Sequence, residues 1–292
     1  MTMQVRLRFA LNHRAAPQLD LPAFFTLVRS LGLSEAEIRN DLPGKPILDG
    51  APPEAVRAAA EATGITILSI NALQRFNDWT PEREVEARHL VEYAAACGAK
   101  SLLLVPVNDG SGRDEQLRLS KAQEGLAALK PILQDRGILG MIEPLGFESC
   151  SLRLKSEVVA AIDAVDGRGV FRLVHDTFHH HLAGEHATFP ELTGLVHISG
   201  VSDEEVPVSG MRDAHRGLVD GADRVDNVEQ IKMLMIEGIE GPYSFEPFAE
   251  SIATLPDPRA AIARSMEYIV TEAGREKPPS QAIRDTLPVP GV

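Results

Sequence analysis

Four short apolar runs in this sequence each end in a residue that can bind a divalent metal ion. These residues are Glu143, Asp176, His197 and Glu246. Three carboxylates and one imidazole suit Mn, Zn, Co or Mg, and the set does not choose between these ions. The alternative is that each carboxylate pairs with an arginine or a lysine. We favour a metal for the set, because three carboxylates crowded together without a cation would repel each other.

Three consecutive histidines, His179, His180 and His181, follow soon after Asp176. We expect His179 to lie on a turn and to point into the site, where it could contact a substrate. We expect the other two to face solvent. A histidine in a loop is more often structural or exposed than functional, so both interpretations of His179 stay open.

Two further polar residues are candidates for substrate binding. Arg216 lies in a long segment over residues 199–224, and its guanidinium could neutralise negative charge on a substrate oxygen. The neighbouring Asp213 fits a solvated turn better. Asn71 closes a β-branched run and is followed by polar and aromatic residues, which suits a sugar ring; ordinary loop capping by Asn71 is the alternative.

The elements that position these residues alternate between strand and helix about eight times. The expected strands cover residues 5–11, 37–39, 65–70, 101–105, 139–143, 171–176, 195–198 and 243–246. The expected helices cover residues 19–31, 53–63, 81–97, 114–136, 155–165, 225–237 and 258–272. This alternation predicts an α/β fold, the (β/α)8 TIM barrel, as a single domain. The carboxyl ends of barrel strands share one rim, so the four metal-capable residues should converge there.

The barrel is expected over residues 1–274, followed by a proline-rich C-terminal tail over 275–292. The formal net charge of −13 argues against non-specific binding to nucleic acid. Cys97 and Cys150 lack a CxxC spacing, so we expect reduced thiols and a cytoplasmic protein. We expect no signal peptide, and no apolar run approaches the roughly 20 residues of a membrane span.

On these segments the chain resembles the xylose isomerase-like barrels, a family of sugar isomerases and epimerases, inosose dehydratases and apurinic endonucleases. The segments that carry the likeness are Glu37-Ile38-Arg39, Asn71-Ala72-Leu73, Val105-Pro106-Val107, Glu143, Asp176-Thr177-Phe178-His179-His180-His181, Val196-His197-Ile198 and Glu246-Pro247-Phe248. They extend over nearly the whole chain, to about Gly274. Within the family, the chain is most similar to the inosose isomerases.

The resemblance implies that Glu143, Asp176, His197 and Glu246 bind one divalent metal ion. It also implies that the two glutamates are the acid and base on opposite sides of a substrate. His179 and Arg216 match family positions that contact substrate oxygens.

In the endonuclease branch, an Asp-x-His motif and the histidine equivalent to His179 hold further zinc ions. Asp213-Ala214-His215 resembles that motif. However, Asn71 ends the third strand and no histidine ends the fourth, so the extra histidine ligands are missing. We therefore expect one metal per chain.

The expected function is metal-dependent isomerisation or epimerisation of a keto-sugar or inosose by proton transfer through an enediolate. The partner is then a small sugar or cyclitol, with neither nucleic acid nor membrane, and a homo-oligomer is possible. One alternative is a dehydratase of the same family, which would expel a β-hydroxyl group. Another is a non-catalytic sugar-binding barrel, although binding alone does not need a matched pair of bases.

Overall fold

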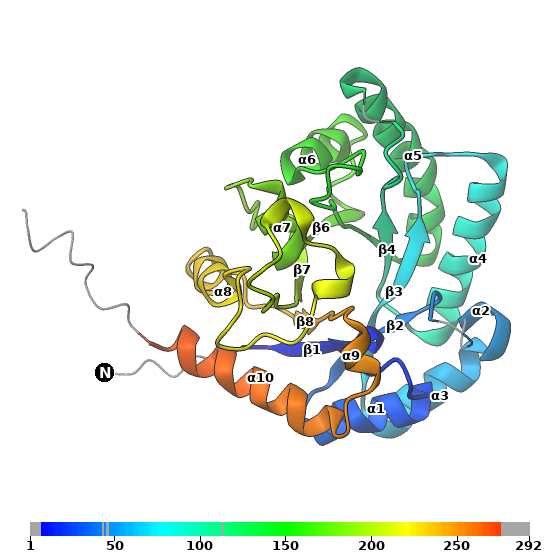
Figure 1. Cartoon of the computed structure of the whole chain (residues 1–292). Helices are drawn as coiled ribbons and strands as arrows, with labels where there is room; N and C mark the ends of the chain where they lie inside the picture. The colour runs from blue at the N-terminus through cyan, green and yellow to red at the C-terminus, as the bar shows by residue number, and fades with distance from the viewer. Residues whose placement is uncertain (1–6, 43, 45–46, 113, 276–292) are drawn as a thin grey trace, which may run out of the picture.

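The computed structural model describes residues 7–42, 44, 47–112 and 114–275. Eight parallel strands close into a barrel in chain order, and the last strand pairs with the first (Figure 1). The predicted (β/α)8 barrel is confirmed. The strands are β1 (Phe9–Asn12), β2 (Glu35–Arg39), β3 (Thr66–Gln74), β4 (Ser101–Val105), β5 (Leu139–Ile142), β6 (Phe171–Asp176), β7 (Thr193–Ile198) and β8 (Tyr243–Phe245).

Helices form a layer around the barrel, following the colour sequence of the chain in Figure 1. They are α1 (Leu21–Ser30), α2 (Ile47–Gly50), α3 (Pro53–Thr63), α4 (Pro81–Cys97), α5 (Glu115–Arg136), α6 (Lys155–Ala164), α7 (Thr177–Ala183), α8 (Asn227–Ile236), α9 (Glu250–Ala253) and α10 (Pro258–Ala273). Three 3-10 turns lie at the rim: η1 (His13–Ala15), η2 (Val208–Gly210) and η3 (Asp213–His215).

Several helices begin and end where local chemistry predicts. The Asp20 carboxylate caps α1 by accepting the Ala23 N–H at 2.9 Å. Helices α3 and α4 have the predicted bounds and end at Gly64 and Gly98. These glycines have φ angles of 68° and 85°, the left-handed region in which a side chain would be strained.

The segment after β6 is the clearest difference from the sequence prediction. A turn was expected there, but residues Thr177–Ala183 form the helix α7. The Asp176 side chain caps it by accepting the His179 N–H at 2.8 Å, and Gly184 ends it. Seven residues that include three histidines carry little helical periodicity, and histidine is a modest helix former, so the pattern indicates a helix only weakly.

A second difference lies in β3, which continues past the predicted end at residue 70 as far as Gln74. Its pairing with β4 shifts register between Ile70 and Leu73. Parts of two further predictions, residues 5–6 of the first strand and residues 276–292 of the tail, lie outside the described residues. The boundary between barrel and tail therefore stays a prediction.

Two apolar layers surround the strands. Large aliphatic and aromatic side chains on the outward positions pack against the helices. Inside the barrel, a smaller cluster fills the space between the strands and consists of Ala72, Leu103, Val174 and Leu195. Side chains alternate between the two faces of a strand. The next inward position toward the carboxyl end therefore lies two residues further on, and on β6 and β7 that position holds Asp176 and His197.

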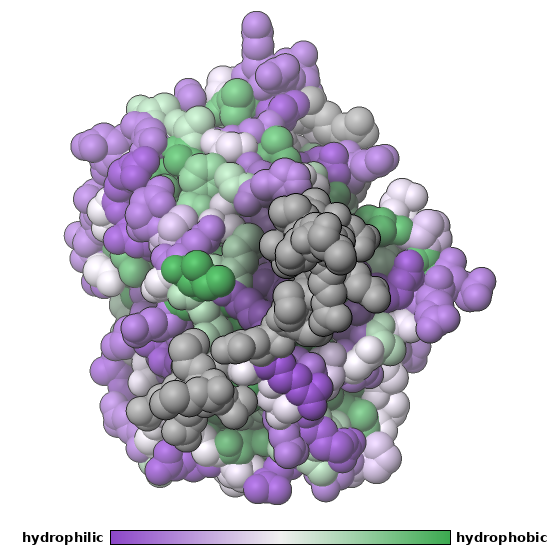
Figure 2. Space-filling model, turned by 90° about the vertical axis from the view of Figure 1, so that its left-hand side faces the viewer, coloured by the Kyte–Doolittle hydropathy of each residue, from purple (hydrophilic) through white to green (hydrophobic). Residues whose placement is uncertain are grey.

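The outer surface is mostly hydrophilic on the face drawn in Figure 2, where hydrophobic side chains form small separate patches. No helix among the described residues combines the length and apolar character needed to cross a membrane.

Candidate metal and substrate site

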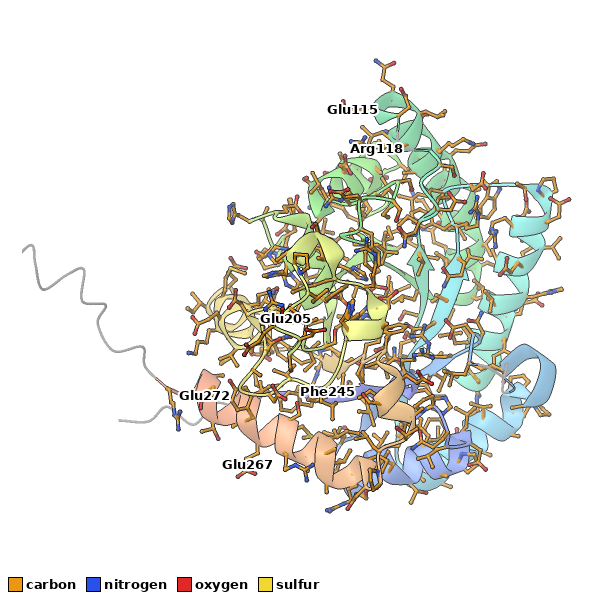
Figure 3. All side chains as sticks on the ribbon, viewed as in Figure 1. Glu115, Arg118, Glu205, Phe245, Glu267 and Glu272 are labelled. Atoms are coloured by element: carbon orange, nitrogen blue, oxygen red, sulfur yellow. The ribbon has the colours of Figure 1, made fainter. Side chains whose placement is uncertain are left out.

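The four predicted metal ligands lie together at the carboxyl end of the barrel. One ligand atom from each of them lies within 4.8 Å of the other three, and all four side chains are buried; they are Glu143, Asp176, His197 and Glu246. Strand register helps to bring them level, since Asp176 and His197 are direct neighbours across β6 and β7. Phe245, labelled in Figure 3, is the last residue of β8 and immediately precedes Glu246.

His197 lies at the centre of this cluster. Its Nδ1 atom is 2.9 Å from Oε1 of Glu143 and 3.2 Å from Oε2 of Glu246. Its Nε2 atom is 3.1 Å from Oε1 of Glu37. Burial by itself would lower the pKa of His197, but the carboxylates of Glu246, Glu37 and Glu143 raise that pKa well above its usual value.

Glu37, on β2, holds His197 from the side opposite to the cluster. This carboxylate is fully buried and accepts hydrogen bonds from Ser244 Oγ at 2.5 Å, Ser69 Oγ at 2.6 Å and Asn71 Nδ2 at 3.0 Å. Burial would raise the pKa of Glu37, but His197 and the hydrogen-bond donors lower it to about 2. An ionised Glu37 keeps a proton on Nε2 and leaves Nδ1 for a metal, an arrangement common among metal-binding histidines.

Asn71 belongs to this buried network. Besides donating to Glu37, its Nδ2 atom lies 2.8 Å from Ser69 Oγ, and its Oδ1 atom lies 3.4 Å from Asn12 Nδ2. The side chain is fully buried. Direct contact between Asn71 and a substrate stays a prediction, and its hydrogen bond to Glu37 was not predicted from the sequence.

Two arginines hold Glu246. Arg39 Nη1 donates to Oε1 at 2.7 Å, and Arg216 Nη2 donates to Oε2 at 3.0 Å. Burial would raise the pKa of Glu246, but His197 and these arginines lower it well below its usual value. Arg39 was not identified as a site residue from the sequence. Arg39 lies two residues after Glu37, so both side chains point inward from β2, and this spacing could have identified it.

Glu143 has a different environment. His197 is the side-chain partner found for its carboxylate, at 2.9 Å. Burial raises the pKa of Glu143 to about 7, with His197 opposing the rise and Glu246 adding to it. Without a bound metal, Glu143 therefore keeps its proton to a higher pH than Glu246 does.

Arg216 reaches the cluster from the long segment after β7, as the sequence predicted. It is 1% exposed, and its Nη2 atom lies 2.5 Å from Oδ2 of Asp176. Asp213, which the sequence placed in a solvated turn, is half-exposed and pairs with Nη1 at 3.2 Å. The segment is fixed by paired backbone hydrogen bonds between Gly200 and Gly217. Burial would lower the pKa of Arg216, but Asp176 and Glu246 raise it, so it stays charged.

His179 also lies in the site. It is buried, its Nε2 atom is 3.4 Å from Arg216 Nη1, and its ring contacts Phe147 and Phe178 edge-on. Burial lowers the pKa of His179, so the ring is neutral. Its Nδ1 atom has no hydrogen-bond partner among the described residues. His180 and His181, which were expected to face solvent, are both partly exposed, and Lys155 Nζ lies 2.5 Å from Nδ1 of His180.

A cavity of about 810 Å³ lies on the same side of the barrel, and its lining residues do not include the four candidate ligands. Loops after β4, β5 and β7 line it together with α7. Two of its lining residues are Phe147, which contacts His179, and Asp213, which pairs with Arg216. The cavity therefore adjoins His179 and Arg216 through Phe147 and Asp213, although neither His179 nor Arg216 is among its lining residues.

The residues present fit a divalent cation. Three carboxylates and a histidine nitrogen offer hard oxygen and borderline nitrogen donors, and Glu37 fixes the histidine with Nδ1 toward the carboxylates.

Comparison with known proteins agrees with this geometry. The sequence pattern of the xylose isomerase-like TIM barrel family matches residues 25–271. The chain belongs to this family. No curated protein matches the chain by sequence.

Solved structures show the same barrel. A xylose isomerase domain protein from Salmonella typhimurium is 31% identical, with a TM-score of 0.85, over 93% of this chain and 100% of its own. The IolI protein, solved with a zinc atom, is 20% identical, with a TM-score of 0.80, over 91% and 98%. A D-psicose 3-epimerase is 16% identical, with a TM-score of 0.67, over 92% and 100%. The narrower likeness to inosose isomerases stays a prediction, since the 20% identity to the IolI protein shows the fold alone.

Proposed function

We propose that the protein is a metal-dependent isomerase or epimerase of a keto-sugar or an inosose, with Glu143 and Glu246 as its acid and base. The observation that carries the proposal is the pair of buried glutamates on either side of His197 Nδ1, at 2.9 and 3.2 Å. In the protein without metal, burial raises the pKa of Glu143, whereas His197, Arg216 and Arg39 lower the pKa of Glu246. Pairs of carboxyl groups whose pKa values are driven apart in this way are typical of acid–base catalysis.

One divalent cation, Mn, Zn, Co or Mg, would be held by the four residues Glu143, Asp176, His197 and Glu246. When bound, it supplies Lewis acidity that polarises a substrate carbonyl and acidifies the neighbouring C–H bond.

The protein side chains move the proton. One glutamate removes it from the carbon next to the carbonyl, which leaves an enediolate. The other glutamate returns a proton, at the adjacent carbon in an isomerase or on the opposite face of the same carbon in an epimerase. The charged Arg216 donates to oxygens that gain negative charge during this step. The neutral His179, with a free Nδ1 atom, is positioned to hold a further substrate oxygen.

The direct experiment is proton exchange in heavy water. A panel of ketohexoses, ketopentoses and inososes would be incubated with the protein and each of the four metals, and deuterium at the α carbon measured by NMR. We expect metal-dependent exchange with at least one ketose or inosose, and a product of unchanged mass apart from the label. A product that has lost water would instead identify a dehydratase. Binding without any exchange would contradict the proposal.

A further inference from the structure

The ring of Phe248 lies among three guanidinium groups at the mouth of the site. Its centroid is 4.6 Å from the Arg216 guanidinium carbon, 4.8 Å from that of Arg14 and 5.3 Å from that of Arg39. Phe248 follows Glu246 by two residues and is partly exposed. The three arginines come from different parts of the barrel: η1, β2 and the segment after β7.

Carboxylates of the protein neutralise two of these arginines. Arg39 pairs with both oxygens of Asp41, at 2.7 Å each, and with Glu246. Arg216 pairs with Asp176, Glu246 and Asp213, as described above.

Arg14 differs from both. Within the described part of the chain, no carboxylate lies within 4 Å of its guanidinium group, and its contact is the Phe248 ring. Its backbone is fixed because the Arg14 N–H donates to Asn12 Oδ1 at 3.0 Å. The side chain is half-buried, and this burial together with the charge of Arg39 lowers the pKa of Arg14, an effect that the more distant carboxylates of Asp41, Glu246 and Asp213 only partly offset. A partly desolvated cation without an ion-pair partner is unfavourable unless an anion binds beside it.

We propose that Arg14 binds an anionic group of the substrate, a carboxylate or a phosphate, at the end remote from the reacting carbonyl. The assignment of the reacting end rests on the proposed function. Arg14 and Arg216 contact the same ring, so one small molecule can extend from the metal-ligand cluster to Arg14. A guanidinium group binds the oxygens of a carboxylate or phosphate in pairs. The substrate is therefore a sugar or cyclitol acid, or its phosphate, rather than a neutral sugar.

The test is isothermal titration calorimetry with three unreactive probes of the same carbon chain: D-glucitol, D-gluconate and D-glucitol 6-phosphate. Each is titrated into the full-length protein, both stripped of metal and loaded with Mn. At least one anionic probe should bind about tenfold more tightly than glucitol, the scale of a charged hydrogen bond. Tighter binding of gluconate alone would identify a carboxylate subsite. Tighter binding of glucitol 6-phosphate alone would identify a phosphate subsite.

Arg14→Gln should abolish this preference, while Arg14→Lys, which keeps the charge, should retain part of it. Arg29→Gln, on the exposed side of α1, removes the same charge far from the site and should leave the preference intact. Equal binding of all three probes to the wild type, or an unchanged preference in Arg14→Gln, would overturn the proposal. A preference for anions that depends on Arg14 but occurs without deuterium exchange would support this subsite and contradict only the isomerase function. Deuterium exchange of neutral ketoses without a preference for anionic probes would support the isomerase function and contradict the Arg14 subsite.

Discussion

Glu143 and Glu246 occupy equivalent places on the two sides of His197, but the surrounding residues differ. On the Glu246 side, Arg39 from β2 and Arg216 from the segment after β7 each donate to one carboxylate oxygen. On the Glu143 side, burial and neighbouring carboxylates favour the protonated form against His197. Equivalent strand ends therefore acquire different chemistry from residues elsewhere in the chain. It also predicts that the two glutamates are not interchangeable.

Removing Asp176 or His197, the candidate metal ligands that lie between the two glutamates, should have the largest effect on metal binding. Asp176→Ala or His197→Ala should reduce the metal content after dialysis from one ion per chain to near zero, because each variant removes a ligand from a four-residue set. Elemental analysis measures this directly. His215→Ala is the matched control, since His215 lies on η3 outside the cluster. Two or three ions per chain, falling in the control variant, would instead indicate a multi-metal, phosphoester-cleaving site.

Changing one side at a time tests the acid–base pair. Glu143→Gln and Glu246→Gln keep an oxygen for the metal but cannot accept a proton as a carboxylate does. Each should lower kcat by at least about a hundredfold, the usual scale of general acid–base catalysis. Steady-state kinetics on variants shown to hold one metal measures the loss. Near wild-type turnover in either variant would remove that residue from the mechanism.

The residue that orients His197 should have a smaller effect. Glu37→Gln keeps the shape of the side chain but loses the charge that fixes the proton on Nε2. We expect metal affinity to fall by roughly 10-fold to 100-fold, as for other residues that orient metal-binding histidines. A competition titration with a chelating dye measures this affinity. Ser69→Ala, which removes one of several donors to Glu37, should have a weaker effect; an equal loss in both variants would argue for a purely structural role.

The two sides should also respond to pH in opposite ways in protein stripped of metal. The raised pKa of Glu143, about 7, means that the folded state binds more protons than the unfolded state between about pH 4.5 and 7. Stability contributed by Glu143 is therefore full below that range and falls as pH rises through it, by at most about 3 kcal/mol. The lowered pKa of Glu246 has the opposite sign, so its contribution is lost as pH falls below about 4.5.

Urea unfolding at a series of pH values measures these contributions. Glu143→Gln should flatten the decrease between pH 4.5 and 7, and Glu246→Gln should flatten the decrease at acid pH. Identical pH profiles for the two variants would show that their environments do not differ as described.

The barrel, and the gathering of four metal-capable residues at its rim, could be predicted from the sequence because both depend on local patterns. Apolar runs ending in Glu143, Asp176, His197 and Glu246 mark strand ends, and a closed parallel barrel brings such ends together.

The residues that hold the candidate ligands in place were not predicted from the sequence. Glu37 and Arg39 lie on a strand for which only three residues were predicted, too few to show which face points inward. The position of Arg216 depends on the bridge between Gly200 and Gly217, which pairs distant parts of an irregular loop and leaves no periodic signal. The helix α7 was missed because it is short and rich in histidine.

Deuterium exchange in the two glutamine variants tests the central claim most directly. If Glu143 and Glu246 each exchange a proton at one of two adjacent carbons, each variant loses conversion between the two isomers. Each should still exchange the α proton of one isomer, and the two variants should retain exchange on different isomers. NMR of both pure isomers in heavy water, with metal-loaded variants, gives the answer. Exchange on the same isomer in both variants, or conversion retained in either, would contradict a mechanism with two bases.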